Sequence, residues 1–417
     1  MFVRRSAAVL AATAVIGTAF APAALADESP SASPSTSPSQ AIATGLYGST
    51  DPTYDGVWRQ SLTLLALHTL DVKPPADAVD WLTGQQCANG AFAPYRADAS
   101  AKCDAKTMVD TNSTAVAVQA LEALGGHDSV TGAAVKWLKS VQNEDGGWGY
   151  APGGASDTNS TSVVIGALTA AGTDLEDVPS QERTPYDALR GLSVPCDEDG
   201  GGAFAFQPGK KGGLAANADA TAAGVLGALG KGLVTEAGET SKDTACVGGD
   251  SFTRQEAAAN GAAYLAGAVA KDGYLKSALA GAEDQPDHGN TADAVVALAA
   301  AGRTADAEKP LAWLAKNSRT WAAKSGPAAY AQLILAAHAT GTDPRDFGGA
   351  DLVKQLGATG PAGADYSSDP RDENTATEEK KDGDDGGVSV WWIVGVGLVG
   401  GIGVGFLISG RNKKQQP

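Results

Sequence analysis

The strongest constraint on the fold is a unit that repeats through the middle of the chain. One copy combines WLTGQQCANGAFAPYR at residues 81–96 with VDTNSTAVAVQALEALGG at residues 109–126. A second combines WLKSVQNEDGGWGYAPGG at residues 137–154 with DTNSTSVVIGALTAAG at residues 157–172. Looser copies follow at residues 192–232 and 264–302. Repetition at this spacing indicates stacked supersecondary units that share one continuous core.

Each unit has the pattern of a helix pair. The first helix is polar on one face and ends at an Asn-Gly or Asp-Gly turn, where glycine stops it. An aromatic residue follows each turn: Phe92, Trp148, Phe204 and Tyr274. The second helix starts at Asp or Asn and is apolar on nearly every side. Because a helix that is apolar all round is buried, the second helices should form an inner layer and the first helices an outer layer.

Two further apolar segments, residues 56–70 and 326–339, complete a prediction of six inner and six outer helices. The predicted fold class is all-α, an (α/α)6 toroid over residues 44–358 with all inner-helix N-termini at one mouth. An open solenoid uses the same helix pairs without closing the ring, and the pattern alone leaves that alternative open.

The segment QNEDGGWG at residues 142–149, with its weaker copy QQCANGAF at residues 85–92, resembles the repeat of the prenyltransferase/terpene cyclase superfamily, the squalene cyclase-like repeat. The resemblance covers roughly residues 44–358 and implies an (α/α)6 toroid. The superfamily includes complement-type thioester domains and cobalamin carriers as well as enzymes, so the resemblance implies the fold more specifically than the function.

The reactive groups of the chemical branches are missing at the matching positions. Where a zinc prenyltransferase carries Asp-x-Cys, this chain has Asp-Thr-Asn at residues 110–112 and again at residues 157–159. The closest counterpart of the Asp-x-Asp-Asp acid of class II terpene cyclases is Asn-Ala-Asp-Ala at residues 217–220, and a Gly-Cys-Gly-Glu-Gln thioester motif is absent. We therefore assign no catalytic residue, although an enzyme with altered motifs remains an alternative.

The binding branch contains exported cobalamin carriers of the transcobalamin and intrinsic factor type. Their inner-helix starts are similar in style to residues 109–121 of this chain. The resemblance makes a corrinoid the sharpest candidate ligand, and no other cofactor is indicated. Those carriers cover the ligand with a second, smaller domain that this chain lacks, so either a separate protein supplies the cover or the ligand differs.

Polar residues gather at the predicted mouth. One interpretation of the first Asp or Asn of each run is capping of the free N–H groups of the following helix. The doubled Asp-Thr-Asn-Ser-Thr string additionally predicts a polar ring suited to a ligand with amide or hydroxyl groups. Asp293 lies near one of these starts, and Trp58 and Gln332 lie on the first and last inner helices. The candidate ligand-binding residues are Asp110, Asn112, Asp157, Asn159, Tyr150, Phe206, Asn217, Asp219, His288 and Asn290.

Alternative roles stay open for several of these residues. Tyr150 and Phe206 follow the turn-packing aromatics by two positions and would be the better ligand contacts of their loops. A lone histidine such as His288 at a helix start also fits a capping or surface role. His288 could also act as a catalytic base or as a ligand to cobalt or zinc. The acidic turns Glu144-Asp145 and Asp197-Glu198-Asp199 could hold calcium, but such turns before glycine are common without an ion, so no metal site is assigned.

The four cysteines predict two disulfides if the chain is exported. Proximity in the sequence favours Cys87–Cys103 and Cys196–Cys246, although three pairings are formally possible. Zinc ligation is the competing interpretation, but no CxxC or HxxxH spacing supports it.

The ends of the chain predict export and anchoring. Residues 1–26 have the charged start, apolar run and Ala-Leu-Ala cleavage site of a signal peptide. A Ser/Pro-rich linker at residues 27–43 precedes the domain, and an acidic stalk at residues 359–387 follows it. Residues 388–409 are apolar and long enough to span a bilayer. The basic tail at residues 410–417 would then lie in the cytoplasm.

The formal net charge of −17 and the lack of a basic stripe argue against a nucleic-acid partner. Together these features predict a single-pass cell-surface protein whose toroid mouth captures a small molecule for hand-over to an uptake system. Its partners would be the membrane, the ligand and a transporter or companion surface protein. A cyclase-like enzyme and a surface adhesion or scaffold protein are the alternatives.

Overall fold

The computed structural model describes residues 44–178, 180–241, 246–248, 252–279 and 281–361. The predicted signal peptide, the Ser/Pro-rich linker, the stalk from residue 362 onward, the membrane span and the basic tail lie outside these residues. Among the residues that the structure describes, no helix combines the length and the apolar character needed to cross a bilayer.

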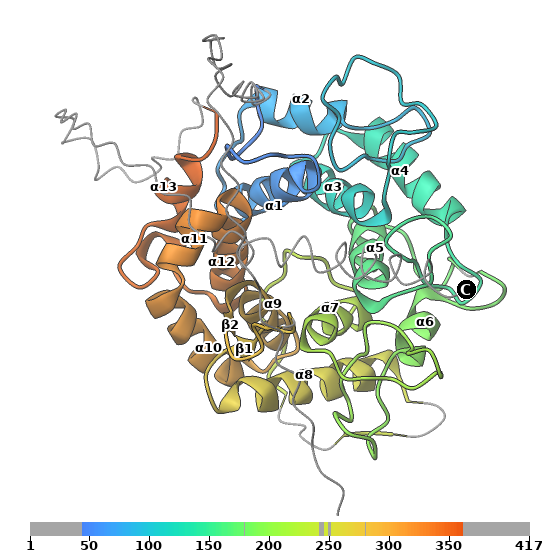
Figure 1. Cartoon of the computed structure of the whole chain (residues 1–417), viewed down its shortest axis with the longest axis vertical. Coiled ribbons are helices and arrows are strands. Elements are labelled where there is room, and N and C mark those ends of the chain that lie inside the picture. The colour runs from blue at the N-terminus through green and yellow to red at the C-terminus, as the bar shows by residue number, and fades with distance from the viewer. Residues whose placement is uncertain (1–43, 179, 242–245, 249–251, 280, 362–417) are drawn as a thin grey trace, which may run out of the picture. The chain divides into compact units, whose positions relative to one another are not determined.

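Six buried helices form an inner ring around a central opening (Figure 1). They are α1 (Gly56–His68), α3 (Thr111–Leu124), α5 (Thr158–Ala170), α7 (Ala218–Ala228), α9 (His288–Ala300) and α12 (Pro327–Thr340). Each helix packs against the next, and α12 packs against α1. This last contact closes the ring, so the all-helical toroid is confirmed and the open solenoid is excluded.

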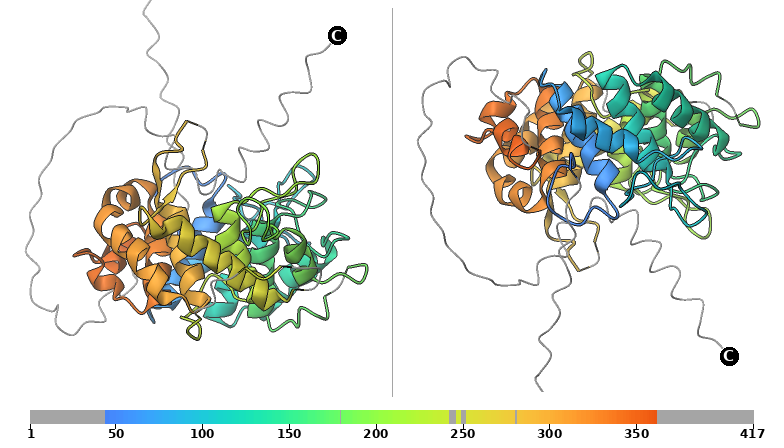
Figure 2. Two further views of the ribbon diagram at one scale, coloured as in Figure 1. Left: turned by 90° about the horizontal axis from the view of Figure 1, so that it is seen from below. Right: turned by 90° about the horizontal axis from the view of Figure 1, so that it is seen from above.

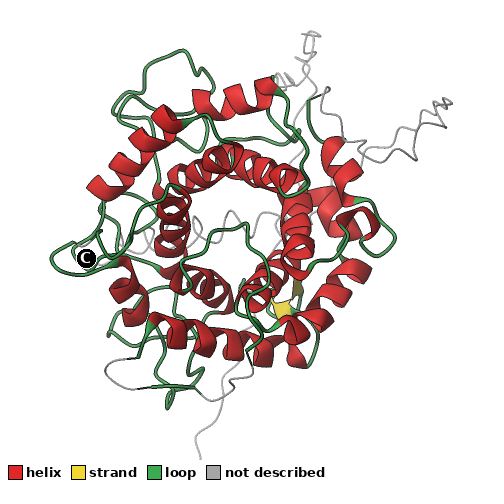
Figure 3. Ribbon diagram, turned by 180° about the vertical axis from the view of Figure 1, so that it is seen from behind, coloured by secondary structure: helices red, strands yellow, loops and turns green. Residues whose placement is uncertain are grey.

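An outer helix packs against each inner helix that precedes it in the chain (Figure 3). These helices are α2 (Ala76–Gly84), α4 (Asp128–Ser140), α6 (Pro185–Gly191), α8 (Arg254–Ala270), α10 (Thr304–Asn317) and α13 (Leu352–Gly357). The predicted alternation of outer and inner helices therefore holds around the whole ring.

Four small elements are not expected from the repeat. A short helix α11 (Arg319–Ser325) and the 3-10 turn η1 (Pro344–Asp346) flank α12. The strands β1 (Leu275–Lys276) and β2 (Pro286–Asp287) pair antiparallel, with Leu275 opposite Asp287. Figure 2 shows the connection between these strands projecting from the layer of helices. The strands hold the chain directly before α9, where the sequence shows only a loop.

The inner layer forms because its helices can be buried on every side. In α5, ten of the thirteen residues are buried, and the helix starts where the side chain of Asp157 accepts a hydrogen bond from the Ser160 N–H. The aromatic residue after three of the turns, Phe92, Trp148 or Phe204, is fully buried, and its backbone N–H donates to a threonine hydroxyl near the start of the following inner helix. The fourth, Tyr274, is half-buried and lies against Trp313. Trp148 is fully buried, and its indole N–H donates to the Leu138 carbonyl at 2.8 Å. The turn of the repeat motif therefore connects the outer helix to the following inner helix and packs against both.

Both predicted disulfides are present, Cys87–Cys103 and Cys196–Cys246. The first closes a 16-residue separation within the loop between α2 and α3. The second spans 50 residues and joins the loop after α6 to the segment before α8. The two bridges restrain the long loops of the ring.

Candidate functional site

The polar runs at the inner-helix starts divide their residues between two tasks. The carboxylates of Asp110 and Asp157 accept hydrogen bonds from the N–H and hydroxyl groups of the serine three positions later, at 2.6–2.9 Å. Asn217 and Asp287 cap α7 and α9 in the same way. The capping residues therefore satisfy the helix ends, as expected for such side chains.

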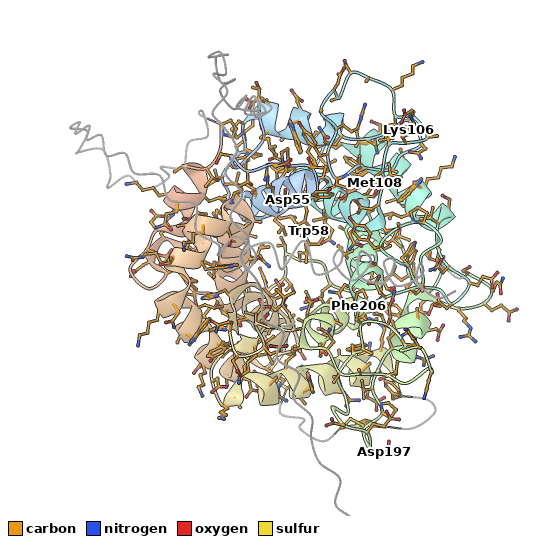
Figure 4. All side chains as sticks on the ribbon, in the orientation of Figure 1. Asp55, Trp58, Lys106, Met108, Asp197 and Phe206 are labelled. Carbon is orange, nitrogen blue, oxygen red and sulfur yellow. A yellow bond between two sulfur atoms is a disulfide. The ribbon has the colours of Figure 1, made fainter. Side chains whose placement is uncertain are left out.

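Residues two positions beyond three of these caps face the interior of the ring instead. Asn112, Asn159 and Asp219 line a central cavity of about 1040 Å³, counting the space open to solvent. The helical turn explains the division, because positions two apart point in different directions. The polar part of the lining also includes Asn290, Asp293, Gln332, Gln119, Ser162 and Lys231. Its apolar part includes Trp58, Leu62, Val163, Leu226, Val296 and Leu335. Figure 4 labels Trp58 beside the central opening.

Two carboxylates in this cavity are held by neutral amides. The Asn159 side-chain nitrogen donates to Asp219 Oδ2 at 2.9 Å. The Gln332 nitrogen donates to both oxygens of Asp293, at 3.2 and 3.3 Å. Burial raises the pKa of Asp219 to about 6. Burial, reinforced by the nearby charge of Asp219, raises the pKa of Asp293 to about 8. Asp293 is therefore largely protonated at neutral pH.

Four buried polar atoms of the lining have no hydrogen-bond partner in the described protein. They are Asn112 Oδ1, Asn159 Oδ1, Asn290 Oδ1 and Ser162 Oγ. The amide nitrogens of Asn159 and Asn290 are committed to Asp219 and Asp287, both at 2.9 Å, which fixes the direction of their oxygens. Such orphaned groups are rare in folded proteins because each costs about 1–3 kcal/mol. The cavity lining therefore offers three amide oxygens that can accept a hydrogen bond from a ligand, and one hydroxyl that can accept or donate one.

A loop segment, residues 231–238, closes the ring at the C-terminal ends of the inner helices. The Leu233 N–H donates to Gln119 Oε1 at 2.9 Å, and the Gly238 N–H donates to the Ala299 carbonyl at 2.9 Å. Lys231 Nζ lies 3.4 Å from the Ala300 carbonyl. This loop belongs to the connection from α7 to α8, and Figures 1 and 3 show it running across the central opening of the ring. This loop consequently covers one end of the cavity, where Lys231, Gly232 and Leu233 belong to its lining.

The structure separates the predicted site residues into two groups. Asn112, Asn159, Asp219 and Asn290 line the cavity together. The caps Asp110, Asp157 and Asn217 are not among the lining residues, and neither are Tyr150, Phe206 and His288.

The three predicted contacts outside the lining have other neighbours. Burial, reinforced by the charge of the neighbouring Asp110 carboxylate, raises the pKa of Tyr150. The Phe206 carbonyl accepts from the Thr158 N–H at 3.0 Å. The His288 ring stacks on Trp321 with centroids 5.4 Å apart. Burial lowers the pKa of His288. These residues support the ring around the cavity.

Several lining residues were missed by the sequence reasoning. Gln119 and Ser162 sit in the middle of helices whose composition predicts only a buried core, and Lys231–Leu233 belong to a loop with no motif. The sequence signal that could have identified Gln119 and Ser162 as lining residues is a polar side chain inside an otherwise apolar helix. Among the described residues, no group of three or more histidine, cysteine or acidic side chains is placed to hold a metal ion.

Comparison with known proteins gives fold-level likenesses only. No family model matches the sequence, and no curated protein matches it. Among solved structures, the chain is similar to ent-copalyl diphosphate synthase from Streptomyces platensis, with 14% identity and a TM-score of 0.46 over 69% of this chain. It spans 50% of that synthase. A protein from Actinoplanes gives 15% identity and a TM-score of 0.48, over 72% of this chain and 95% of the other. Likenesses of this size say nothing about what this chain binds.

Proposed function

We propose that this protein is a ligand-capture receptor displayed at the cell surface. The observation that carries the proposal is the set of buried, unpartnered acceptors of the cavity, Asn112 Oδ1, Asn159 Oδ1 and Asn290 Oδ1. A ligand that inserts N–H or O–H groups would satisfy them and recover the free energy they cost. The cavity combines convergent polar groups with apolar walls, as small-molecule sites commonly do.

The ligand is a small molecule that presents several hydrogen-bond donors, and a corrinoid with its peripheral amides is the sharpest candidate. The inner space suits a side group of such a molecule, and its body would rest at the mouth. Anchoring comes from the predicted span at residues 388–409, and the predicted acidic stalk holds the domain away from the bilayer. Captured ligand would pass to a membrane transporter or to a companion surface protein.

The test is a titration of the full chain with cobalamin, with cobinamide and with a panel of small amides and polyols, followed by calorimetry and absorbance. Asn112→Leu removes one buried acceptor from the lining and should weaken binding about tenfold or more. Asn317→Leu, an exposed change on α10, is the control and should leave affinity unchanged. Absence of saturable binding to the corrinoids at millimolar concentration would end the corrinoid assignment. Absence for the whole panel would contradict the receptor role.

A second function, acid catalysis, is favoured by one observation, the raised pKa of Asp293. A protonated carboxyl in a partly apolar cavity can transfer its proton to an alkene, leaving a carboxylate on the protein and a carbocation on the substrate. Incubation with polyprenyl diphosphates and squalene, followed by product analysis, tests this function. Cyclised products that vanish in Asp293→Asn would favour the enzyme over the receptor.

A further inference from the structure

The two cavity carboxylates come from neighbouring inner helices. Asp219 lies in the first turn of α7, Asp293 lies in the second turn of α9, and these helices pack against each other. Both residues line the same cavity. In the part of the chain that the structure describes, neither carboxylate forms an ion pair with a lysine, arginine or histidine. Two carboxyl groups thus share one cavity, and neither is paired with a basic side chain of the described protein.

Positive charge in this cavity is held away from the two carboxylates. The lining includes Lys231, which belongs to the loop that covers one end of the cavity. Its ammonium is positioned by the carbonyls of Ala300 and Glu236, at 3.4 and 3.5 Å. The groups that do reach the carboxylates are the neutral amides of Asn159 and Gln332. A positively charged group of a ligand would therefore complement the two carboxylates.

A second observation concerns polar side chains of the cavity lining that have no hydrogen-bond partner in the described protein. Asn112 is 4% exposed and Ser162 is 5% exposed, yet Asn112 Oδ1 and Ser162 Oγ have no partner in the protein. Asn159 Oδ1 and Asn290 Oδ1 share this condition. Because their nitrogens are already committed to Asp219 and Asp287, these amides cannot rotate to offer donors without losing those bonds. The cavity lining therefore presents the acceptor oxygens of Asn159 and Asn290 in addition to the two acids.

We propose that Asp219 and Asp293 form a subsite for a protonated primary amine carried by the ligand. The proposal rests on the receptor function and names the chemical class of its ligand. An ammonium group offers three N–H donors and no acceptor, which matches two carboxylates and a free amide oxygen. The apolar side chains of Leu62, Leu226, Val296 and Leu335 would surround the carbon skeleton attached to the amine.

The electrostatics of the two carboxyl groups support this assignment. Burial raises the pKa values of both Asp219 and Asp293. The Asp219 charge raises the pKa of Asp293 further, and the Asp287 charge adds to both shifts. An ammonium between the two carboxylates would cancel that repulsion and favour their charged forms. Binding of a cation at this place should therefore release protons to the buffer.

The test is calorimetry on the full chain at pH 8 with cyclohexylmethylammonium as the probe and cyclohexylmethanol as its neutral counterpart. An alkyl ammonium stays protonated at this pH. We expect the amine to bind at least about tenfold tighter than the alcohol. Its binding enthalpy should differ between buffers of unequal ionisation enthalpy, because protons are released.

Variants locate the binding. Asp219→Asn and Asp293→Asn keep the side-chain shape and should each weaken amine binding at least about tenfold, with little effect on the alcohol. Asp351→Asn at the start of α13 is the matched control, since asparagine caps a helix as well as aspartate does. Equal affinity for amine and alcohol, or full amine affinity in both cavity variants, would overturn the subsite.

The outcomes also separate this inference from the receptor function. Binding of a corrinoid or a neutral panel member without any amine binding would overturn the ammonium subsite and leave the receptor role standing. Amine binding without corrinoid binding would support the subsite and exclude the corrinoid. Absence of binding by every probe would overturn both.

Discussion

Gln332 on α12 donates hydrogen bonds from its side-chain nitrogen to both carboxylate oxygens of Asp293 on α9. The two residues are 39 positions apart and meet because their helices are neighbours in the ring. These bonds lower the pKa of Asp293, whereas burial and the charge of Asp219 raise it. The balance between these hydrogen bonds and the opposing effects of burial and the Asp219 charge sets the pH at which Asp293 ionises.

Replacing Gln332 with leucine should destabilise the protein more at pH 9 than at pH 5. At pH 9 Asp293 is charged and loses the donor that favours its carboxylate, whereas at pH 5 it is protonated. Urea unfolding at the two pH values measures the difference. In the double variant Gln332→Leu/Asp293→Asn the dependence on pH should disappear. An equal loss of stability at both pH values would contradict this account.

The stability of the protein should fall as pH rises from about 4 to about 8. The pKa of Asp293 is raised from 3.8 to about 8 on folding. Between these values the folded protein holds a proton that the unfolded chain has lost, so the contribution is fully present below about pH 4 and is lost near pH 8. Each pKa unit corresponds to about 1.4 kcal/mol.

Asp293→Asn should flatten this decline and gain stability over the parent protein most clearly at pH 8 and above. Burial also raises the pKa values of Asp110, Asp157 and Asp219 to about 6, so a shallower decline should persist in the variant up to about pH 6. Unfolding free energies measured across this range give both curves. Parallel curves for the two proteins would show that Asp293 does not titrate as described.

Gly166→Ala should lower the unfolding free energy by about 1–3 kcal/mol through overpacking. A Cβ at this position of α5 would lie 2.9 Å from the Cα of Gly232 and 2.8 Å from the Gln119 nitrogen, where the closing loop meets the ring. Gly132→Ala on α4 is the matched control, because a Cβ there meets nothing within 4 Å. That change should stabilise the helix by about 0.5–1 kcal/mol. Thermal unfolding compares them, and similar effects of the two changes would contradict the close approach.

Removal of Cys196–Cys246 should cost more stability than removal of Cys87–Cys103. On a chain-entropy basis, the separations of 50 and 16 residues correspond to about 4 and about 3 kcal/mol. Paired Cys→Ala variants, unfolded by urea under the same conditions, provide the comparison. A larger loss from the shorter loop would mean that native contacts of the loops outweigh chain entropy.

The sequence by itself determined the helix pairs, their assignment to inner and outer layers and both disulfides. These features depend on local patterns: an apolar helix bounded by Asp or Asn and glycine, a Gly-aromatic turn, and cysteines close in the chain. It also placed Asn112, Asn159, Asp219 and Asn290 among the ligand candidates, and these four share one cavity. The predicted export signal and membrane span depend on residues outside those that the structure describes.

Only the tertiary structure decided which polar residues face the cavity and which cap helices. Asp110 and Asn112 are two residues apart and equally polar, but the rotation of α3 buries the first in a cap and turns the second inward. Packing of α12 against α9 brings Gln332 to Asp293, and packing of the loop at Leu233 against Gln119 covers one end of the cavity. These contacts join residues far apart in the chain, so the pKa values and the unpartnered polar atoms of the cavity arise only when the helices pack together.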